Sequence, residues 1–359
     1  MKKLLFVVSD MRIGGIQKSL LNLLKRISGE YEIALFCSNL DGEYLSDVPK
    51  GIAVLDEDIY AKISEISIAD CKRLGFRYAF LRAALSFWSH LFGKRLSAAF
   101  LTKKICFLGK YDAAISYAQP INERRFSSLT NEIVLKCCQA EKKITFLHCD
   151  FGEYGGNSPY NRSLYHHFDM IAAVSESVGN RFSDINPTLR DKVITVYHVF
   201  DESRIRFLAD ESPVSYSRFS LVTVARLSKE KGLLRCIPIF SKLKQEGFLF
   251  EWYLIGEGDC RLELVKSIQK YGLEREIILV GEQKNPYRYM KKANYFFLPS
   301  VHEAAPMVFG EAACLGIPIL TTRTLSADEL VRDNGIGIVC DNNSGAIYEM
   351  LKGVMDKGL

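Results

Sequence analysis

Short apolar runs that alternate with helical segments constrain this chain more than any other feature. The first run, Leu4–Val8, is followed by a Gly14-Gly15 turn, and apolar residues then recur at helical spacing from Ile16 to Ile27. This order of strand, glycine turn and helix opens a parallel α/β unit. Similar runs follow at Glu32–Phe36, Asp112–Tyr117, Lys143–Leu147, Met170–Val174 and Val193–Val199. They predict a parallel sheet covered by helices on both faces.

The same alternation starts again after a polar interval. Residues 201–218 are polar, contain Pro213 and show little periodicity, which is typical of a linker. Further strands are expected at Leu221–Ala225, Glu251–Ile255, Ile277–Val280, Tyr295–Leu298, Ile317–Leu320 and Ile336–Val339, with helices at Glu230–Gln245, Cys260–Lys270, Pro286–Lys292 and Met307–Leu315. We therefore predict an α/β protein with two Rossmann-like domains and a ligand cleft between them. The expected segments are a first domain at 1–205, a linker at 206–218, a second domain at 219–345 and a C-terminal helix at 346–359 that could return to the first domain.

Composition agrees with this architecture and excludes several classes of protein. The 359 residues are 48% hydrophobic and 25% charged, as in average globular proteins, so disordered, collagen-like and coiled-coil classes are excluded. The apolar stretches fall short of the roughly 18 residues that a membrane-spanning helix requires, and Leu4–Val8 is too short for a signal peptide. Ten scattered cysteines without a Cys-x-x-Cys pair argue against a zinc site or a disulfide framework. A cytoplasmic protein is expected.

Two cations in the second half follow the first expected strand of that half. Arg226 stands at the strand end and Lys231 at the helix entry, so both side chains can converge on one anion. Arginine offers a fork of donors and lysine a point charge, a combination that suits a diphosphate. From the spacing alone, two solvated surface cations are the slightly favoured interpretation.

Two glutamates flank the start of a later helix. Glu303 lies in the loop after the Tyr295–Leu298 strand, and Glu311 lies on the following helix, whose N-terminus near Met307 offers unpaired backbone N–H groups. The pair could hold sugar hydroxyls on either side of a phosphate. Alternatively, Glu303 only caps the helix and Glu311 is a surface residue. The Gly256-Glu257-Gly258 turn lacks the third glycine of a dinucleotide fingerprint and therefore disfavours a dehydrogenase.

Taken together, these segments resemble glycosyltransferase family 4, whose members are retaining GT-B enzymes that use nucleotide sugars. The resemblance rests on Arg226, Lys231-Gly232, Gly256-Glu257-Gly258, Asn285-Pro286-Tyr287, Leu298-Pro299-Ser300 and Glu303-x7-Glu311, followed by Gly316-Ile317-Pro318. It implies a catalytic set of Arg226, Lys231, Glu303 and His148, and donor contacts from Gly14, Gly15, Gly256, Pro306, Met307, Val308 and Glu311. Two departures from the family pattern are Ala304, where glycine is usual, and Gly310, where a larger aliphatic residue is common.

The resemblance also implies a chemistry that needs no metal or other cofactor. Arg226, Lys231 and a helix dipole would meet the charge that builds on the departing diphosphate, and UDP is favoured over GDP as the nucleotide. In the family the leaving phosphate is described as taking the acceptor proton, so no protein nucleophile is assigned. Asp56-Glu57-Asp58 has the form of a metal-binding Asp-x-Asp, but a solvated turn after a strand is the favoured interpretation.

His148 stands at the end of an expected strand and is followed by Cys149-Asp150. By itself it could be an ordinary core imidazole, whereas the family resemblance implies a place near the reacting sugar. The next stretch, Phe151–Pro159, is rich in glycine and is typical of a loop at a cleft. Asp150 and Glu153 are weaker candidates for binding the acceptor.

A basic and aromatic segment points to the kind of acceptor. Between Cys71 and Lys110 there are many Lys and Arg residues and no Asp or Glu. Phe80, Ala84, Phe87, Trp88, Leu91 and Phe92 share one face of a helix. Such a helix suits an anionic lipid surface, with membrane-facing residues expected at Arg77, Arg82, Trp88, Lys94, Arg95, Lys103 and Lys104. An ordinary core helix with solvated lysines stays open, whereas nothing resembles a nucleic-acid-binding motif.

These observations together predict a retaining, metal-independent hexosyltransferase. It would move a sugar from a nucleotide diphosphate sugar to a lipid-linked or saccharide acceptor, in the synthesis of capsule or another surface polysaccharide. Its expected location is the cytoplasm, peripherally on the inner face of the plasma membrane. The alternatives are a catalytically silent nucleotide-sugar-binding subunit, an inverting GT-B transferase and an epimerase.

Overall fold

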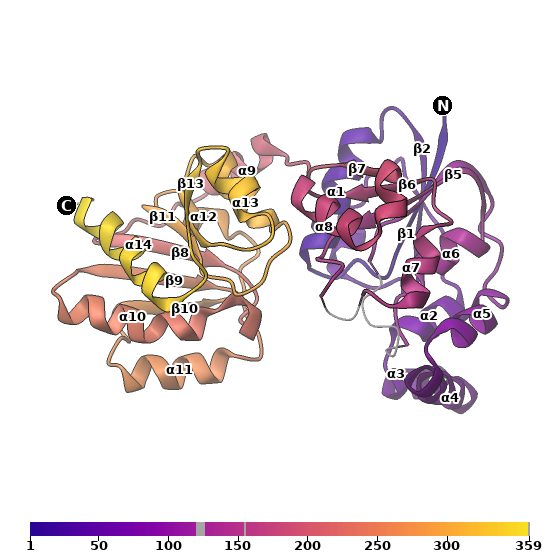
Figure 1. Cartoon of the computed structure of the whole chain (residues 1–359), viewed down its shortest axis with the longest axis horizontal. Coiled ribbons are helices and arrows are strands. Elements are labelled where there is room, and N and C mark those ends of the chain that lie inside the picture. Colours follow the sequence, from indigo (N-terminus) through magenta and orange to yellow (C-terminus); the bar gives the residue numbers. More distant parts are fainter. Residues whose placement is uncertain (120–125, 154–155, 358–359) are drawn as a thin grey trace. The chain divides into compact units, whose positions relative to one another are not determined.

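The computed structural model describes residues 1–119, 126–153 and 156–357 (Figure 1). It divides into two compact units, Met1–Val199 and Phe200–Leu359. The boundary differs from the predicted end of the first domain at 205 and from the predicted linker at 206–218. Residues Glu202–Asp210 form helix α9, whose Ile205 and Ala209 are buried in the core of the second unit. A helix with two buried apolar residues belongs to the unit that it packs on, although its polar composition resembles a linker.

The first unit is built on a parallel sheet of seven strands in the order β3-β2-β1-β4-β5-β6-β7. The strands are β1 (Lys3–Val8), β2 (Glu32–Cys37), β3 (Ala53–Val54), β4 (Lys110–Ser116), β5 (Gln139–Leu147), β6 (Met170–Ala173) and β7 (Val193–Thr195). Its helices and short helical turns are α1 (Gly15–Ile27), η1 (Glu43–Asp47), α2 (Ile59–Glu65), α3 (Ile68–Leu74), α4 (Phe76–Phe92), α5 (Arg95–Thr102), α6 (Thr130–Lys136), α7 (Pro159–Tyr165), α8 (Glu176–Ile185) and η2 (Pro187–Lys192).

One face of this sheet packs against helices that follow β3 and β4 in the chain. Leu5 and Val7 of β1 share a buried cluster with Ala61 of α2, Leu101 of α5 and Ile133 of α6. Helices α3 and α4 lie beyond this layer, at the bottom of Figure 1. Within the described residues, no helix of either unit is long and apolar enough to cross a membrane.

The second unit has a parallel six-stranded sheet in the order β10-β9-β8-β11-β12-β13. The strands are β8 (Phe219–Val224), β9 (Phe250–Ile255), β10 (Ile277–Gly281), β11 (Tyr295–Leu298), β12 (Ile319–Thr322) and β13 (Gly337–Cys340). The remaining helical elements are η3 (Lys229–Lys231), α10 (Leu233–Gln245), α11 (Arg261–Lys270), α12 (Tyr287–Met290), α13 (Met307–Cys314), η4 (Asp328–Arg332) and α14 (Ser344–Lys357). The helix expected from Glu230 begins only at Leu233, because Gly232 takes a left-handed conformation (φ 65°) that ends η3.

Helices cover both faces of the second sheet. Helices α10, α11 and α14 pack on one face, around the fully buried Trp252. Helices α9, α12 and α13 pack on the other face, around Phe296. Helix α14 buries Ile347, Leu351 and neighbouring apolar residues in this core, so the C-terminal helix, for which a return to the first domain was considered, is part of the second unit. The prediction of two Rossmann-like units is confirmed.

Candidate functional site

The candidate site of the second unit lies where the strand order of the sheet reverses. Strands β8 and β11 are neighbours, yet the chain leaves β8 toward α10 on one face and β11 toward α13 on the other. The carboxyl ends of two such strands leave a crevice in which α/β proteins bind ligands. The loops at these two strand ends, 225–232 and 299–306, contain Arg226, Lys231 and Glu303.

An ion pair joins the two loops. Lys231 Nζ donates to Oε1 of Glu303, and the Ser300 hydroxyl donates to the same oxygen at 2.8 Å. The side chains of Lys231 and Glu303 are 19% and 12% exposed, so the pair is shielded but open to a ligand. Because both donors bind Oε1, Oε2 of Glu303 has no protein donor in the described part of the chain.

Glu230 lies between the two predicted cations in the 225–232 loop. Arg226 is exposed, unlike Lys231. Burial by itself would raise the pKa of Glu230, but a hydrogen bond from Ser228 at 2.6 Å and the charges of Lys231 and Arg226 hold this pKa below its usual value. The backbone oxygen of Glu230 also accepts the N–H of Val301 at 2.8 Å. Lys231 is therefore held beside the loop that carries Glu303, whereas Arg226 is exposed at the end of β8.

Two glycines of this region are required by close backbone approach. A Cβ on Gly232 would lie 2.2 Å from the Pro299 oxygen, and one on Gly256 would lie 2.0 Å from the Ala225 oxygen. Both residues have positive φ angles, 65° and 140°, which disfavour any other residue. Gly256, a predicted donor contact, thus has a structural role in bringing the β9 loop against the backbone next to Arg226.

Helix α13 supplies the remaining donor-side candidates. Its N-cap is Pro306, which provides no side-chain cap, so the first N–H groups near Met307 and Val308 have no capping partner from that residue. The alternative that Glu303 caps this helix is wrong. The alternative that Glu311 is a surface residue is also wrong, because Glu311 is 2% exposed and accepts a hydrogen bond from Tyr287 at 3.4 Å.

The two departures from the family pattern have different physical surroundings. A Cβ on Gly310 would lie 2.2 Å from the ring of Phe200, so the Phe200 ring occupies the space that a larger residue would need. Ala304, directly after Glu303, is buried, with 9% of its surface exposed.

No local sequence pattern indicated Arg235, which positions the loop after β11. From α10 its guanidinium donates to the carbonyl of Pro299 at 2.8 Å and to Asn342 Oδ1 at 2.6 Å. A third, longer bond reaches the carbonyl of Ser300 at 3.3 Å. The partners are backbone atoms and an amide far away in sequence, which no local motif could indicate.

His148 in the first unit is buried but incompletely hydrogen-bonded. Its ring lies among Tyr117, Phe146 and His198, with centroids 4.8, 5.6 and 6.2 Å away. Burial, and then the neighbouring His198, lower the pKa of His148 to about 3, so the imidazole is neutral. Its Nε2 atom is buried and has no hydrogen-bond partner among the described residues. An ordinary core imidazole would have both nitrogens satisfied.

The glycine turn after β1 leads into helix α1. Gly14 is the N-cap and supplies no side-chain cap, and the first turn of α1 contains no acidic residue. Asp10 accepts hydrogen bonds from Gln17 at 3.1 Å and from Nε of Arg12 at 2.8 Å, which orders the turn. Gly14 and Gly15 thus present a helix start without a side-chain cap from Gly14, shortly after the end of β1.

Most of the other candidate carboxylates of the first unit form hydrogen bonds or ion pairs within that unit. Asp150 is 8% exposed, binds the N–H of Gly152 at 2.7 Å and pairs with Arg181 at 3.3 Å. Glu153 is exposed, and residues 154 and 155 of the following loop lie outside the described residues. Asp58 caps helix α2, and Glu57 pairs with Lys62 at 2.8 Å. The interpretation of this acidic run as a turn after a strand fits these bonds.

Two of the predicted membrane-facing residues point inward. Lys94 is 1% exposed and lies 3.3 Å from Glu132, which is fully buried. Arg82 is half-buried, donates to the carbonyl of Ile66 at 3.1 Å and stacks on Phe126. Both predictions are wrong because each cation finds acceptors or an aromatic face inside its own unit. The other five (Arg77, Trp88, Arg95, Lys103 and Lys104) are exposed.

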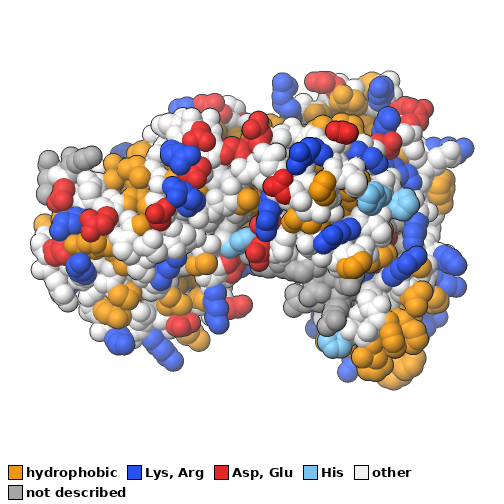
Figure 2. Space-filling model, in the orientation of Figure 1, with side chains coloured by type: hydrophobic (Ala, Val, Ile, Leu, Met, Phe, Trp, Pro, Cys, Tyr) orange, Lys and Arg blue, Asp and Glu red, His pale blue; other side chains and the backbone are white. Residues whose placement is uncertain are grey.

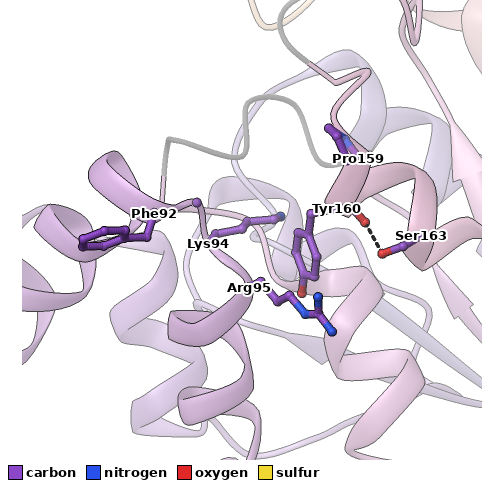
Figure 3. A pocket seen from close by; sticks show the side chains of 7 residues that line it. Phe92, Lys94, Arg95, Pro159, Tyr160 and Ser163 are labelled. Atoms are coloured by element: carbon purple, nitrogen blue, oxygen red, sulfur yellow. Dashed lines mark hydrogen bonds between the residues drawn. The ribbon is translucent and has the colours of Figure 1, made fainter.

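A pocket of the first unit lies between the end of α4 and α7 (Figure 3). Phe92, Lys94 and Arg95 line it from one side, and Pro159, Tyr160 and Ser163 line it from the other. Tyr160 donates to Glu132 at 3.2 Å, so the pocket wall is tied to the buried Lys94–Glu132 pair.

Comparisons with known proteins point to one superfamily. Residues 208–357 match the family model "Glycosyl transferases group 1". The chain is 27% identical over 243 residues to N-acetylgalactosamine-N,N'-diacetylbacillosaminyl-diphospho-undecaprenol 4-alpha-N-acetylgalactosaminyltransferase of Campylobacter jejuni, covering 65% of this chain and 62% of that protein. It is 24% identical over 165 residues to an uncharacterized glycosyltransferase of Methanocaldococcus jannaschii, covering 44% of this chain and 41% of that protein. These matches span less than two thirds of either relative.

Solved structures resemble the chain over nearly its whole length. Anabaena HepE in complex with UDP covers 99% of this chain and 90% of its own, with a TM-score of 0.65 at 16% identity. At this identity the likeness shows the fold. The chain therefore has the GT-B fold, and the match to the Glycosyl transferases group 1 model lies within its second unit.

Proposed function

We propose that this protein is a retaining glycosyltransferase of family 4 that transfers a hexose or related sugar from a nucleotide diphosphate sugar. The acceptor would be a lipid-linked or growing saccharide in the synthesis of capsule or a related surface polysaccharide. The reaction would take place in the cytoplasm and would need no metal. The relative from Campylobacter jejuni, whose name describes transfer to a diphospho-undecaprenol-linked sugar, supports this acceptor class.

One observation carries the donor assignment. The Lys231–Glu303 ion pair lies at the switch point of the second sheet, within the segment that matches the family model. In the proposed complex a diphosphate takes Lys231 and Arg226 as counter-charges, and Glu303 is released to accept sugar hydroxyls. Positive charge that is fixed before the reaction stabilises the leaving nucleotide as its charge develops.

The other candidates surround that reaction centre in the proposal. The backbone N–H groups of Met307 and Val308, which follow the N-cap Pro306, would bind sugar or phosphate oxygens, and Glu311 would hold the ribose. In the first unit, Gly14 and Gly15 would contact the donor, and neutral His148 would use its unpaired Nε2 toward the reacting sugar. Asp150 and Glu153 remain weaker proposals for the acceptor, since Asp150 already holds Arg181.

Calorimetric titration with UDP, GDP and ADP in the presence of EDTA tests the donor site. We expect one nucleotide, UDP, to bind the wild type without added metal. Lys231→Ala should weaken that binding, whereas Lys229→Ala, which removes an exposed lysine from the same turn, should not. Absence of binding by all three nucleotides would remove the enzyme assignment and leave only the fold.

Product analysis separates the remaining possibilities. Glu303→Gln should keep nucleotide binding and lose transfer, because a neutral amide accepts sugar hydroxyls less strongly than a carboxylate. The anomeric configuration of the product, determined by NMR, should match that of the donor. Inversion would favour an inverting GT-B enzyme, interconversion of free nucleotide sugars an epimerase, and tight binding without turnover a silent subunit.

A further inference from the structure

Helix α4 turns six large apolar side chains outward, whereas Leu85 is buried and Leu81 packs on the core. Ala79, Leu85 and Ser89 are the buried residues of this helix. The outward residues are more than 45% exposed: Phe76 80%, Phe80 68%, Phe87 65%, Trp88 46%, Leu91 54% and Phe92 66%. We call these six residues the docking face. A surface helix ordinarily places its apolar side toward the core and its polar side toward water, so the apolar outer side of α4 departs from that pattern.

The apolar surface extends past the helix and is visible as a group of hydrophobic side chains over α3 and α4 in Figure 2. Leu96 and Phe100 on α5 are 60% and 46% exposed, and Phe107 is 63% exposed. Single exposed apolar residues are common on proteins, but a contiguous aromatic patch marks a surface that another phase or molecule covers. The expectation of an ordinary core helix is therefore wrong for α4.

The charges around the docking face select one kind of partner. Arg77 lies on α4, Arg95 begins α5, and Lys103 and Lys104 follow α5, and all four are exposed. No Asp or Glu occurs between Cys71 and Lys110. Aromatic side chains within a rim of basic residues match a bilayer surface that has an apolar interior and anionic headgroups. A second copy of this chain would present the same positive rim and would be repelled.

We propose that the docking face inserts into the interface of an anionic phospholipid membrane, with Arg77, Arg95, Lys103 and Lys104 against the lipid headgroups. Arg82 and Lys94 take no part, because they are held inside the unit. Phe92 belongs to the docking face and also lines the pocket of Figure 3, so the pocket borders the membrane-bound surface. The inserted area is confined to the first unit and does not involve the donor-site residues of the second.

Intrinsic fluorescence gives a site-specific test, because the chain has only two tryptophans. Trp88 is 46% exposed on the docking face, and Trp252 is fully buried in the core of the second unit. Vesicles of phosphatidylcholine with a third of phosphatidylglycerol should shift the emission to shorter wavelength, and brominated acyl chains should quench it. Vesicles of phosphatidylcholine alone should have a weaker effect. Trp88→Phe should abolish the change while vesicle flotation persists.

Flotation of variants tests the two components of the surface separately. Phe87→Ser with Leu91→Ser should lower the partition coefficient about tenfold or more, because apolar burial supplies much of the binding. The matched control Leu262→Ser removes a side chain that is 75% exposed on α11 and should change nothing. Lys103→Gln and Lys104→Gln should each weaken binding to anionic vesicles about fivefold, and Lys266→Gln on α11 should not.

Three outcomes would overturn the proposal. They are no flotation on anionic vesicles, flotation without any change in Trp88 emission, and a concentration-dependent dimer that Phe87→Ser with Leu91→Ser dissolves. None of these measurements needs donor or acceptor. A failure of membrane docking is therefore distinguishable from a failure of the proposed glycosyl transfer, which is read from nucleotide binding and product.

Discussion

Two lysine–glutamate pairs, one in each unit, look alike in sequence but differ in their surroundings. Lys94 and Glu132 are 1% and 0% exposed; Tyr160 donates to Oε1 of Glu132 and Lys94 donates to the Ser128 carbonyl, whereas Oε2 of Glu132 has no hydrogen-bond partner among the described residues. Lys231 and Glu303 are 19% and 12% exposed and join two loops at the carboxyl ends of neighbouring strands. The first pair is enclosed by its own unit, whereas the second is open to a ligand.

This difference separates a structural pair from a candidate binding pair. Taking two charges out of water costs several kcal/mol per ion. In an enclosed pair this cost is offset only by the attraction between the two well-placed charges, so neither residue can exchange its partner. A partly exposed pair costs less to form and less to break. An incoming diphosphate can therefore replace Glu303 as the partner of Lys231. Lys94 borders the pocket of Figure 3, but only 1% of its side chain is exposed and its partner Glu132 is fully buried.

The largest expected effect is the loss of stability when the Lys94–Glu132 pair is broken. Lys94→Met should lower the free energy of unfolding by about 3–5 kcal/mol, because it leaves the Glu132 carboxylate buried without a counter-charge. Urea denaturation followed by circular dichroism measures this loss. Adding Glu132→Leu should recover part of it. A loss of less than about 1 kcal/mol would show that the pair is more accessible than the structure indicates.

Breaking the Lys231–Glu303 pair should affect nucleotide binding more than the free energy of unfolding. Lys231→Ala should weaken nucleotide binding by about 10- to 100-fold, since a charge-assisted bond contributes roughly 1.5–3 kcal/mol. It should change the free energy of unfolding by only about 1 kcal/mol or less. Calorimetry and denaturation on the same preparation provide both numbers. A large loss of stability with unchanged binding would erase the distinction between the pairs.

A pH experiment extends the comparison to His148, another enclosed group of the first unit. Its pKa is lowered to about 3 in the folded protein by burial and then by His198, whereas an unfolded histidine titrates near 6.5. Between these values the unfolded state binds more protons, so this group lowers the free energy of unfolding as the pH falls from about 6.5. The expected slope is up to about 1.4 kcal/mol per pH unit.

Comparison with His148→Gln isolates this contribution. Burial raises the pKa of Glu65 to about 7, so that residue acts in the opposite direction over part of the same range. Because Glu65 is present in both proteins, its effect cancels when the two stability profiles are subtracted. Parallel profiles between pH 4 and 6.5 would mean that His148 is hydrated and charges normally.

The smallest effect is expected for Lys229→Ala. Lys229 is exposed and stands two residues before Lys231 in the same turn. Its removal should change stability by less than about 0.5 kcal/mol and nucleotide affinity by less than about twofold, because a solvated charge outside the pair is screened. A loss of nucleotide affinity as large as that of Lys231→Ala would mean that positive charge in general, rather than the Lys231–Glu303 geometry, binds the nucleotide.

Much of the fold could be predicted from the sequence because the patterns that specify strands and helices are local. Buried parallel strands are short apolar runs, and helices repeat every 3.6 residues, so strands such as Tyr295–Leu298 were predicted with their observed bounds. The errors occurred where packing overrides composition. A polar segment became α9 because Ile205 and Ala209 are buried, and the left-handed Gly232 delayed the start of α10.

For this protein the sequence by itself determined the two α/β units, the chain segments that carry the candidate site and the aromatic face of one helix, all of which follow from residue type and spacing. Only the tertiary structure decided which charges are enclosed and which stay reachable. Arg82 and Lys94 turned inward, Glu311 became buried, and Arg235 tied down a distant loop. Burial and hydrogen-bond partners depend on residues far apart in the chain, so no local pattern specifies them.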